Sequence, residues 1–487
     1  MRQLLVAALA LAACRDKPPA QPATAGSGGS AGSGGSAGSG GSGSAAADPW
    51  NAPAAPKLPN TPAARQQRAE AALARVATIL PEVAKLRGLA FAREVPRRYQ
   101  TAAEFQAFVR RGIAKELPPE RSRDLSTAFA HLGLLTKPID LAQIVEQAVT
   151  TQAGAYYDPD AKAFFLVMVP DNILALDMMS AHELTHALQD QHFNLTKYLP
   201  VNGSLDDDAA VARRFVAEGD ATFLMMLYAM HGVLGDQLTP RTLATLRSQI
   251  TKFAAQNVDS LKAMTKSQAT AFTAFGMDGD IKKAFDAMDD IPPIVLVPLL
   301  DSYMKGALVA LTAYDHAGWP GIDELYRDPP ESTEQVLHPA TKLFPVRDHP
   351  HHVTLARTGE AELFGNVIGE LQWKVYFELW KSPHAAEATE GWGGDRYVVT
   401  RRKDGRLIGR IATIWDTEAD AEQFASAYLA SLAVRFPGAG ASPPAAGFAR
   451  PDGGRVFLRT AGTKVFIVDG ADDASALDAL VRTTKFD

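Results

Sequence analysis

The spacing of apolar side chains changes three times along this chain of 487 residues. A short apolar run from Leu4 to Ala13 is followed by a stretch without apolar periodicity that extends to about residue 60. Apolar residues then recur at helical spacing as far as residue 344, and short strand-like runs separated by turn signals follow. The pattern predicts an α+β protein in which a mainly helical unit over 62–344 precedes a small α+β unit over 345–487.

The first 13 residues have the composition of a bacterial signal peptide. Arg2 precedes the apolar run, which is too short to span a bilayer as a permanent helix. The run ends in Leu-Ala-Ala-Cys, which resembles a lipobox, so we expect cleavage before Cys14 and lipidation of that residue. A plain secretory signal with a chance cysteine is the alternative. Because Arg15 rather than aspartate follows the cysteine, we expect an extracytoplasmic lipoprotein of the cell envelope, sorted to the outer membrane where one is present.

Residues 14–61 are dominated by Gly, Ser, Ala and Pro and predict a flexible tether with a reach of about 35 Å. Cys14 is the only cysteine, so intramolecular disulfides are excluded. The formal net charge is -6, and the chain has no basic stripe with interleaved aromatic residues. Nucleic acid is therefore not an expected partner.

The segment 171–193 contains an H-E-x-x-H motif formed by His182, Glu183 and His186. The segment has no Gly or Pro, and its apolar residues recur at helical spacing, so we expect a helix. A step of four residues turns a helix by about 400°, which places both imidazoles on one face, one turn apart. Such a pair can share a metal, and the glutamate beside it can polarise a metal-bound water. The alternative is a pair of core histidines bonded to backbone carbonyls.

Two residues compete to be the third ligand of such a metal. Glu218 lies in a predicted helix over 204–230, on a face shared with apolar residues, where an unpaired carboxylate is costly to bury. The adjacent Gly219 disfavours a helix by about 1 kcal/mol but lets another backbone approach closely. His192 is the rival, but in a continuous helix it lies about 9 Å along the axis from His186 and roughly 120° around it. We therefore prefer Glu218, for which pairing with a nearby arginine is the alternative.

The arrangement of His182, Glu183 and His186, followed by a helix-borne Glu218, resembles the gluzincin branch of the zincin superfamily of metallopeptidases. The longer string H-E-L-T-H-A-L-Q-D-Q-H-F, together with S-T-E-Q-V-L-H-P at 332–339, resembles a largely uncharacterised group of predicted metallopeptidases of prokaryotic envelopes. The resemblance covers residues from about 85 to 345 and implies a zincin-like catalytic domain with a small edge sheet.

The resemblance also implies a cofactor, a reaction and a substrate class. His182, His186 and Glu218 would hold Zn²⁺, and Glu183 would act as general base on a zinc-bound water in the hydrolysis of a peptide or protein. Thermolysin-like members carry an aspartate four residues after the glutamate ligand. This chain has a threonine there, and Asp220 is only a possible substitute. The alternative function is a non-catalytic envelope binding or assembly module with a structural or vestigial zinc site, although a structural site needs no base.

The resemblance suggests further groups near the reaction. A capping box at 332–335 predicts a short helix that Pro339 ends, with His338 in its last turn. Related peptidases use a second histidine or a tyrosine to donate to the oxyanion, so His338 is a candidate for that role. Weaker candidates are Tyr303, Tyr156 and Tyr157.

Two groups of strands are expected. Residues 155–169 predict a β-hairpin, and in zincins the strand before the active-site helix is the edge along which extended peptides lie; an ordinary buried strand is the alternative. Beyond residue 345 the order β-β-α-β-β-α predicts a small antiparallel sheet with helices on one face. The segment 391–397 is either a recognition loop or a turn that buries Trp392.

Overall fold

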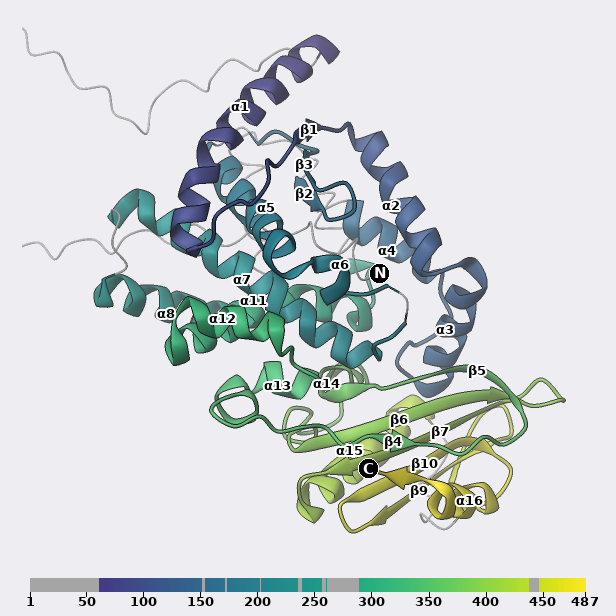
Figure 1. The fold of residues 1–487 in the computed structure, drawn as a ribbon. Coiled ribbons are helices and arrows are strands. Elements are labelled where there is room, and N and C mark those ends of the chain that lie inside the picture. Colours follow the sequence, from purple (N-terminus) through teal and green to yellow (C-terminus); the bar gives the residue numbers. More distant parts are fainter. Residues whose placement is uncertain are drawn as a thin grey trace, which may run out of the picture.

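The structure is a computed structural model that describes residues 61–487 except 151–153, 171–172, 202, 235–238, 256–259, 261–288 and 438–445. The predicted signal peptide, Cys14 and nearly all of the tether lie outside the described residues. The predicted α+β class is observed. In Figure 1 a mainly helical part with a small sheet lies above a larger sheet formed by the C-terminal part.

The helical part is close to the predicted one, with differences at helix boundaries. The pattern over 102–135 divides at Pro118 into two helices, because proline lacks the backbone N–H that a helix interior uses. The helix that carries Glu218 is capped by Asp206 rather than by the predicted Ser204, since Oδ1 of Asp206 accepts from the backbone N–H of Ala209 at 2.7 Å. The elements are α1 (Pro62–Arg87), β1 (Arg97–Tyr99), α2 (Ala102–Glu116), α3 (Pro119–Leu132), α4 (Leu141–Thr150), β2 (Ala155–Asp158), β3 (Ala163–Leu166), α5 (Ile173–Phe193), α6 (Leu195–Tyr198), α7 (Asp207–Leu234), α8 (Pro240–Ala254), α11 (Pro293–Ala317), α12 (Trp319–Arg327), α13 (Thr333–Leu337) and the π-helix η1 (Pro339–Leu343).

Helix α5 lies at the centre of the helical part. Every residue from Leu176 to Asp190 is buried, so the helix is enclosed on all sides rather than on the single stripe expected from its apolar spacing. Helices α1 and α7 and strand β2 pack against it. A motif placed in this helix is therefore held by neighbours from distant parts of the chain.

Helices α7 and α11 approach one another unusually closely. A Cβ added at Gly219 of α7 would lie 2.1 Å from the carbonyl oxygen of Gly306 in α11. The close backbone approach expected at Gly219 is therefore present, and only glycine permits it. Helix α11 is long and apolar enough to cross a membrane by composition alone, but 78% of its most apolar window is buried inside the protein, as in a core helix.

The small sheet has the order β1-β3-β2. The predicted hairpin is present as antiparallel β2 and β3, and β1 adds a parallel strand on the other side of β3. Strand β3, which precedes α5, ends at Leu166 and is paired on both sides, so it is the buried strand of the second alternative and not an edge. The edge strand nearest α5 is β2, whose Tyr157 is buried against that helix.

The larger sheet is antiparallel throughout, with the order β5-β6-β7-β10-β9-β8. Both predicted hairpins and both predicted helices of this unit are present. Strands β4 and β11 form a separate two-stranded sheet. The elements are β4 (Val353–Thr354), β5 (Ala361–Asn366), α14 (Gly369–Leu379), β6 (Trp392–Arg401), β7 (Leu407–Trp415), α15 (Glu418–Arg435), β8 (Phe448–Ala449), β9 (Arg455–Ala461), β10 (Lys464–Ala471), α16 (Ser475–Thr483) and β11 (Lys485–Phe486).

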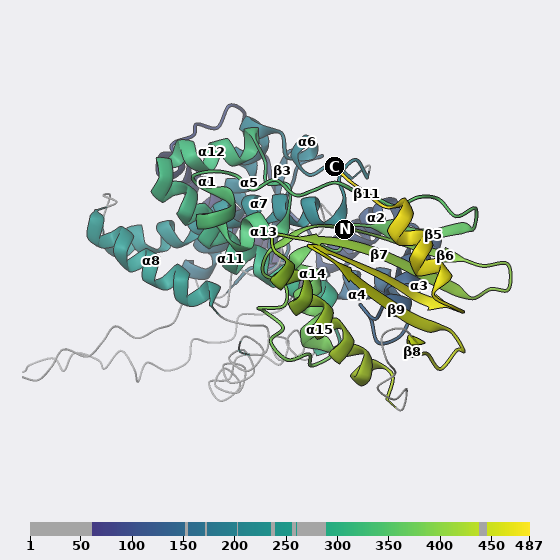
Figure 2. The same ribbon diagram turned by 90° about the horizontal axis from the view of Figure 1, so that it is seen from below.

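Helices cover both faces of this sheet, which corrects the expectation of helices on one face (Figure 2). Along β10, Val465 and Ile467 belong to the apolar cluster that contains α14 and α15, whereas Phe466 and Val468 belong to the cluster that contains α16. Successive strand residues point to opposite faces, so an uninterrupted apolar run on β10 needs cover on both sides.

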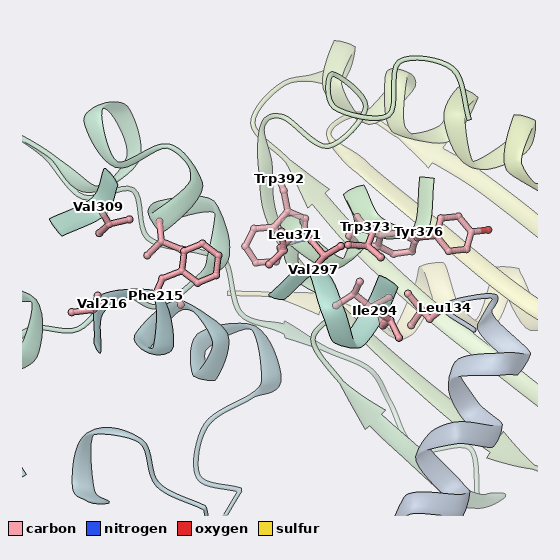
Figure 3. Close-up of a cluster of buried hydrophobic side chains, with 14 of the residues drawn as sticks. Leu134, Phe215, Val216, Ile294, Val297, Val309, Leu371, Trp373, Tyr376 and Trp392 are labelled. Carbon is pink, nitrogen blue, oxygen red and sulfur yellow. The ribbon is translucent and has the colours of Figure 1, made fainter. Parts of the chain in front are cut away.

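One hydrophobic core crosses the predicted domain boundary near residue 345. Figure 3 shows Phe215 of α7 and Ile294 of α11 in the same cluster as Trp373 of α14 and Trp392 of β6. Trp392 is 2% exposed and its Nε1 donates to Asp395 at 2.9 Å. The tryptophan is thus buried as one alternative predicted, but residues 392–397 form the start of strand β6 rather than a turn. The helical part and the sheet are therefore packed as one body.

Candidate metal centre

Helices α5 and α7 bring His182, His186 and Glu218 together as three convergent donors. Nε2 of His182 lies 3.2 Å from Nε2 of His186 and 3.2 Å from Oε2 of Glu218. The remaining separation, from Nε2 of His186 to Oε2 of Glu218, is 3.5 Å. The exposed fractions of the three residues are 3, 1 and 0%. We call these three residues the metal triad.

The separations within the metal triad fit a tetrahedral zinc ion. Donors bound to zinc at about 2.0–2.1 Å lie about 3.3–3.4 Å from one another in a tetrahedron. The observed edges of 3.2, 3.2 and 3.5 Å bracket that value. Two imidazoles and one carboxylate also form a donor set that zinc accepts, with one position left for water or substrate. The residues present therefore fit zinc in number, type and spacing.

The electrostatics of the metal triad also favour a cation. Burial alone would raise the pKa of Glu218, but the neighbouring imidazoles of His186 and His182 lower it below its ordinary value. Burial lowers the pKa of His182, whereas in His186 the carboxylate of Glu218 overcomes burial and raises the pKa to about 9. The buried carboxylate thus stays ionised only with positive charge beside it, which a divalent cation would supply.

Glu183 lies on α5 between the two histidines and is also buried, with 3% exposed. Its Oε2 accepts a hydrogen bond from the backbone N–H of Tyr157 in β2 at 2.9 Å. Burial raises the pKa of Glu183 to about 8, which His186 and the bond from Tyr157 partly oppose. A carboxylate with a raised pKa, next to a cluster of metal-binding type, has the properties of a general base.

A glutamine orients one imidazole of the triad. Nδ1 of His186 lies 2.8 Å from Oε1 of Gln189, and Nε2 of Gln189 donates to Asp220 at 3.1 Å. Asp220, the possible substitute for the thermolysin-type aspartate, therefore reaches the histidine through an amide rather than directly. Gln189 was not among the predicted site residues. Its position three residues after His186, on the same helix face, was the available signal.

His192 lies away from the metal triad. Helix α5 continues without a break to Phe193, which carries His192 around the helix and onto the surface. There its Nε2 lies 2.7 Å from the carbonyl oxygen of Ala90. His192 therefore lies where the geometry of a continuous helix predicted it, away from the metal triad.

His338 also lies away from the triad, which corrects the expectation of an oxyanion donor. Its Nε2 lies 2.7 Å from Oε1 of Glu370 at the start of α14. Thr333, at the start of the same short helix, donates its backbone N–H to Asp208 at 2.9 Å. Asp208 and Glu218 are ten residues apart on α7, or about 15 Å. Contacts of Thr333 and His338 therefore tie the helical part to the C-terminal part.

The three candidate tyrosines have different surroundings. The ring of Tyr303 in α11 stacks on the imidazole of His182, with ring centroids 5.7 Å apart. The hydroxyl of Tyr156 donates to Gln100 at 2.7 Å, and that of Tyr157 donates to Asp190 at 2.8 Å. Of these three, Tyr303 is the tyrosine in ring contact with the metal triad.

A second group of convergent acids lies at the boundary with the C-terminal part and consists of Glu334, Asp348 and Asp416. The ammonium group of Lys342 lies between them, 3.0 Å from Glu334, 2.6 Å from Asp348 and 2.5 Å from Asp416. We call these four residues the lysine-filled cluster. Because a side chain of the protein already occupies its centre, it is not a candidate for a bound metal.

A known family model matches the C-terminal part of the chain. Residues 356–481 match the family described as "Domain of unknown function (DUF8575)". No curated protein and no solved structure matches the chain. The matched residues include the six-stranded sheet and none of the metal triad, so the chemistry of the helical part must be argued from its geometry.

Proposed function

We propose that this protein is a zinc-dependent peptidase of the zincin type. The observation that carries the proposal is the metal triad itself, whose three donor atoms lie 3.2, 3.2 and 3.5 Å apart. Glu183 lies on α5, the helix that carries both histidines. Three protein donors leave one position of a tetrahedral site for water or substrate, as catalytic zinc sites do. The zincin resemblance of the motif supports the same reaction.

Each protein group has a defined task in this proposal. His182, His186 and Glu218 hold the ion, which when bound supplies Lewis acidity to the scissile carbonyl and to water. Glu183 accepts a proton from the attacking water and returns it to the leaving amine, for which a pKa near neutrality is suited. Tyr303, which stacks on His182, takes the place of His338 as the candidate donor to the developing oxyanion.

A non-catalytic module with a structural zinc site is the second candidate, and burial favours it. His182, His186 and Glu183 are at most 3% exposed and Glu218 is fully buried. Oε2 of Glu183 is also engaged by the backbone of β2. A peptide reaches these groups only if β2 moves relative to α5, whereas a structural ion needs no such movement.

The proposed location is the cell envelope, with the protein anchored to the membrane through lipidated Cys14. This part of the proposal rests on the lipobox-like sequence alone. A peptide or protein of the envelope is then the proposed substrate. Labelling of the chain with a radioactive or alkyne-tagged fatty acid, lost in Cys14→Ser, tests the anchor separately from the activity.

The function is tested by comparing the wild type with Glu183→Gln. Metal content is measured in both purified proteins, and both are assayed against a peptide library. We expect about one zinc per chain in both proteins and cleavage only by the wild type, because the amide cannot accept the water proton. Zinc without cleavage by the wild type would favour the structural alternative. A wild type without affinity for zinc would exclude both candidates.

A further inference from the structure

The two imidazoles of the metal triad are held in different ways. Nδ1 of His186 has the side-chain oxygen of Gln189 as its partner at 2.8 Å. Nδ1 of His182 is buried and has no hydrogen-bond partner among the residues that the structure describes. The orientation of one ligand is therefore set by a specific contact, and that of the other by packing, including the ring of Tyr303.

The neighbours of Gln189 decide which way round its amide lies. Nε2 of Gln189 lies 2.9 Å from the carbonyl oxygen of Ala217 and 3.1 Å from Oδ2 of Asp220. Both partners are acceptors, so this end of the amide must be the NH₂ group. Oε1 then faces Nδ1 of His186 and accepts a hydrogen bond from the N–H at that nitrogen. In the neutral form of His186, which is the form that binds a metal, the unprotonated nitrogen is consequently Nε2, the atom that points at His182 and Glu218.

Asp220 is itself fixed by groups from two other helices. It is fully buried, and Nε of Arg87, the last residue of α1, donates to it at 2.8 Å. The hydroxyl of Tyr326 in α12 donates to it at 3.0 Å. Arg87 is 1% exposed and also bonds Asp323 at 2.7 Å, so the buried charges of this group are compensated. The network therefore runs from α1 through α7 to the histidine of α5.

We propose that Arg87, Asp220 and Gln189 form a positioning relay that fixes the tautomer and the ring orientation of His186 for metal binding. In many metal sites a carboxylate bonds the imidazole directly. Here the neutral amide of Gln189 bonds His186, and the carboxylate of Asp220 bonds the amide. Metal-binding histidines depend on such partners, and their loss lowers affinity by about 10–100-fold. The proposal rests on the proposed metal site but not on peptidase activity.

The test measures zinc affinity of the purified full chain by competition with a chromophoric chelator. Gln189→Met keeps the side-chain length and helix propensity but removes both hydrogen-bonding ends, and we expect a loss of affinity of about 10–100-fold. Thr222→Val is the matched control. Its hydroxyl is buried without a hydrogen-bond partner among the described residues, and it occupies the position of the thermolysin-type aspartate. We expect an affinity within about twofold of the wild type for this control.

Asp220→Asn and Co²⁺ binding separate positioning from general loss of structure. We expect the visible absorption of the Co²⁺-loaded protein to change in Gln189→Met and Asp220→Asn but not in Thr222→Val, because only the first two disturb the contacts that hold the ligand His186. An unchanged affinity and spectrum in Gln189→Met would overturn the relay. If that variant does not fold, Asp220→Asn decides in the same way. A wild type that binds zinc but cleaves no peptide would contradict the proposed function without contradicting the relay.

Discussion

Among the residues that the structure describes, two clusters each bring three potential metal-ligand atoms within 4.8 Å of one another, and their charges are neutralised in opposite ways. In the metal triad, the groups facing the buried carboxylate of Glu218 are two imidazoles, which bind metal only when they are neutral. In the lysine-filled cluster, three carboxylates surround the ammonium group of Lys342. Without a metal, the first cluster can be neutralised only by protonation of an imidazole, which a bound metal would replace, whereas the second contains a permanent ammonium group.

Burial accompanies this difference. Glu218 is fully buried, whereas the side chains of Asp348 and Asp416 are 45 and 39% exposed. Water can solvate the two aspartates of the lysine-filled cluster, so their charges cost little, but no such relief exists in the metal triad. Proximity of acids is therefore a poor sign of a metal site by itself, and the presence or lack of an internal cation is the better one.

The largest expected effect is on zinc binding by Glu218→Ala. Removal of one of three protein donors should weaken zinc binding by on the order of a hundredfold to a thousandfold, since zinc sites derive about 10–16 kcal/mol from their full ligand set. The matched control is His192→Ala, which should bind zinc like the wild type because this side chain bonds Ala90 at the surface. Isothermal titration at fixed pH measures both. Equal affinities for the two variants would show that the triad is not the zinc site.

The next effect concerns the helix contact that positions Glu218. Gly219→Ala places a methyl group 2.1 Å from the carbonyl oxygen of Gly306, so α7 and α11 must separate. We expect a loss of about 1–3 kcal/mol in the free energy of unfolding from this overpacking, even though alanine favours a helix. Urea denaturation of the metal-free protein measures it. A variant as stable as the wild type would mean that the two helices do not need this approach.

Lys342→Met removes the cation of the lysine-filled cluster and tests whether the stability of the protein then depends on an added cation. The buried Glu334 would then face two carboxylates, and we expect a loss of stability of about 1–3 kcal/mol, limited by the exposure of the two aspartates. Millimolar Ca²⁺, which prefers carboxylate oxygens, should restore part of this loss in the variant and not affect the wild type. Denaturation with and without Ca²⁺ tests both points. Stability that is independent of Lys342 would remove the contrast between the clusters.

The metal triad could be predicted from sequence because its information is local. The spacing of His182 and His186 is a property of one helix, and Glu218 beside Gly219 marks a helix face that approaches another backbone. The relay behind the triad could not be predicted in the same way. Arg87 and Asp220 are 133 positions apart, so only the packing of α1 against α5 and α7 brings them together.

The errors have similar causes. The capping box at 332–335 correctly predicted the start of a short helix, but it contained no information about which element would face His338. The two-sided cover of the large sheet was readable in principle, because β10 has four consecutive apolar residues from Val465 to Val468. The predicted one-sided cover followed from the order of strands and helices, which does not show that both faces of β10 are apolar.

Two histidines at the boundary between the helical part and the large sheet extend the comparison to pH, with the smallest expected effect. Nε2 of His131 lies 3.0 Å from the carbonyl oxygen of Asp469, and burial, reinforced by Arg450, lowers the pKa of this histidine. The hydrogen bond with Glu370 raises the pKa of His338. The surroundings thus favour the neutral form of His131 and the charged form of His338.

The two histidines should therefore give stability profiles of opposite slope. The unfolded chain protonates His131 more readily than the folded protein does, so its contribution is intact above about pH 6.5 and is lost as the pH falls. The contribution of His338 is intact below about pH 6.5 and is lost as the pH rises through its raised pKa. We expect His131→Gln to reduce the loss of stability on the acid side and His338→Gln to reduce it on the alkaline side. Urea denaturation between pH 5 and 8 measures both, and profiles that stay parallel to the wild type would show that neither contact depends on its proton.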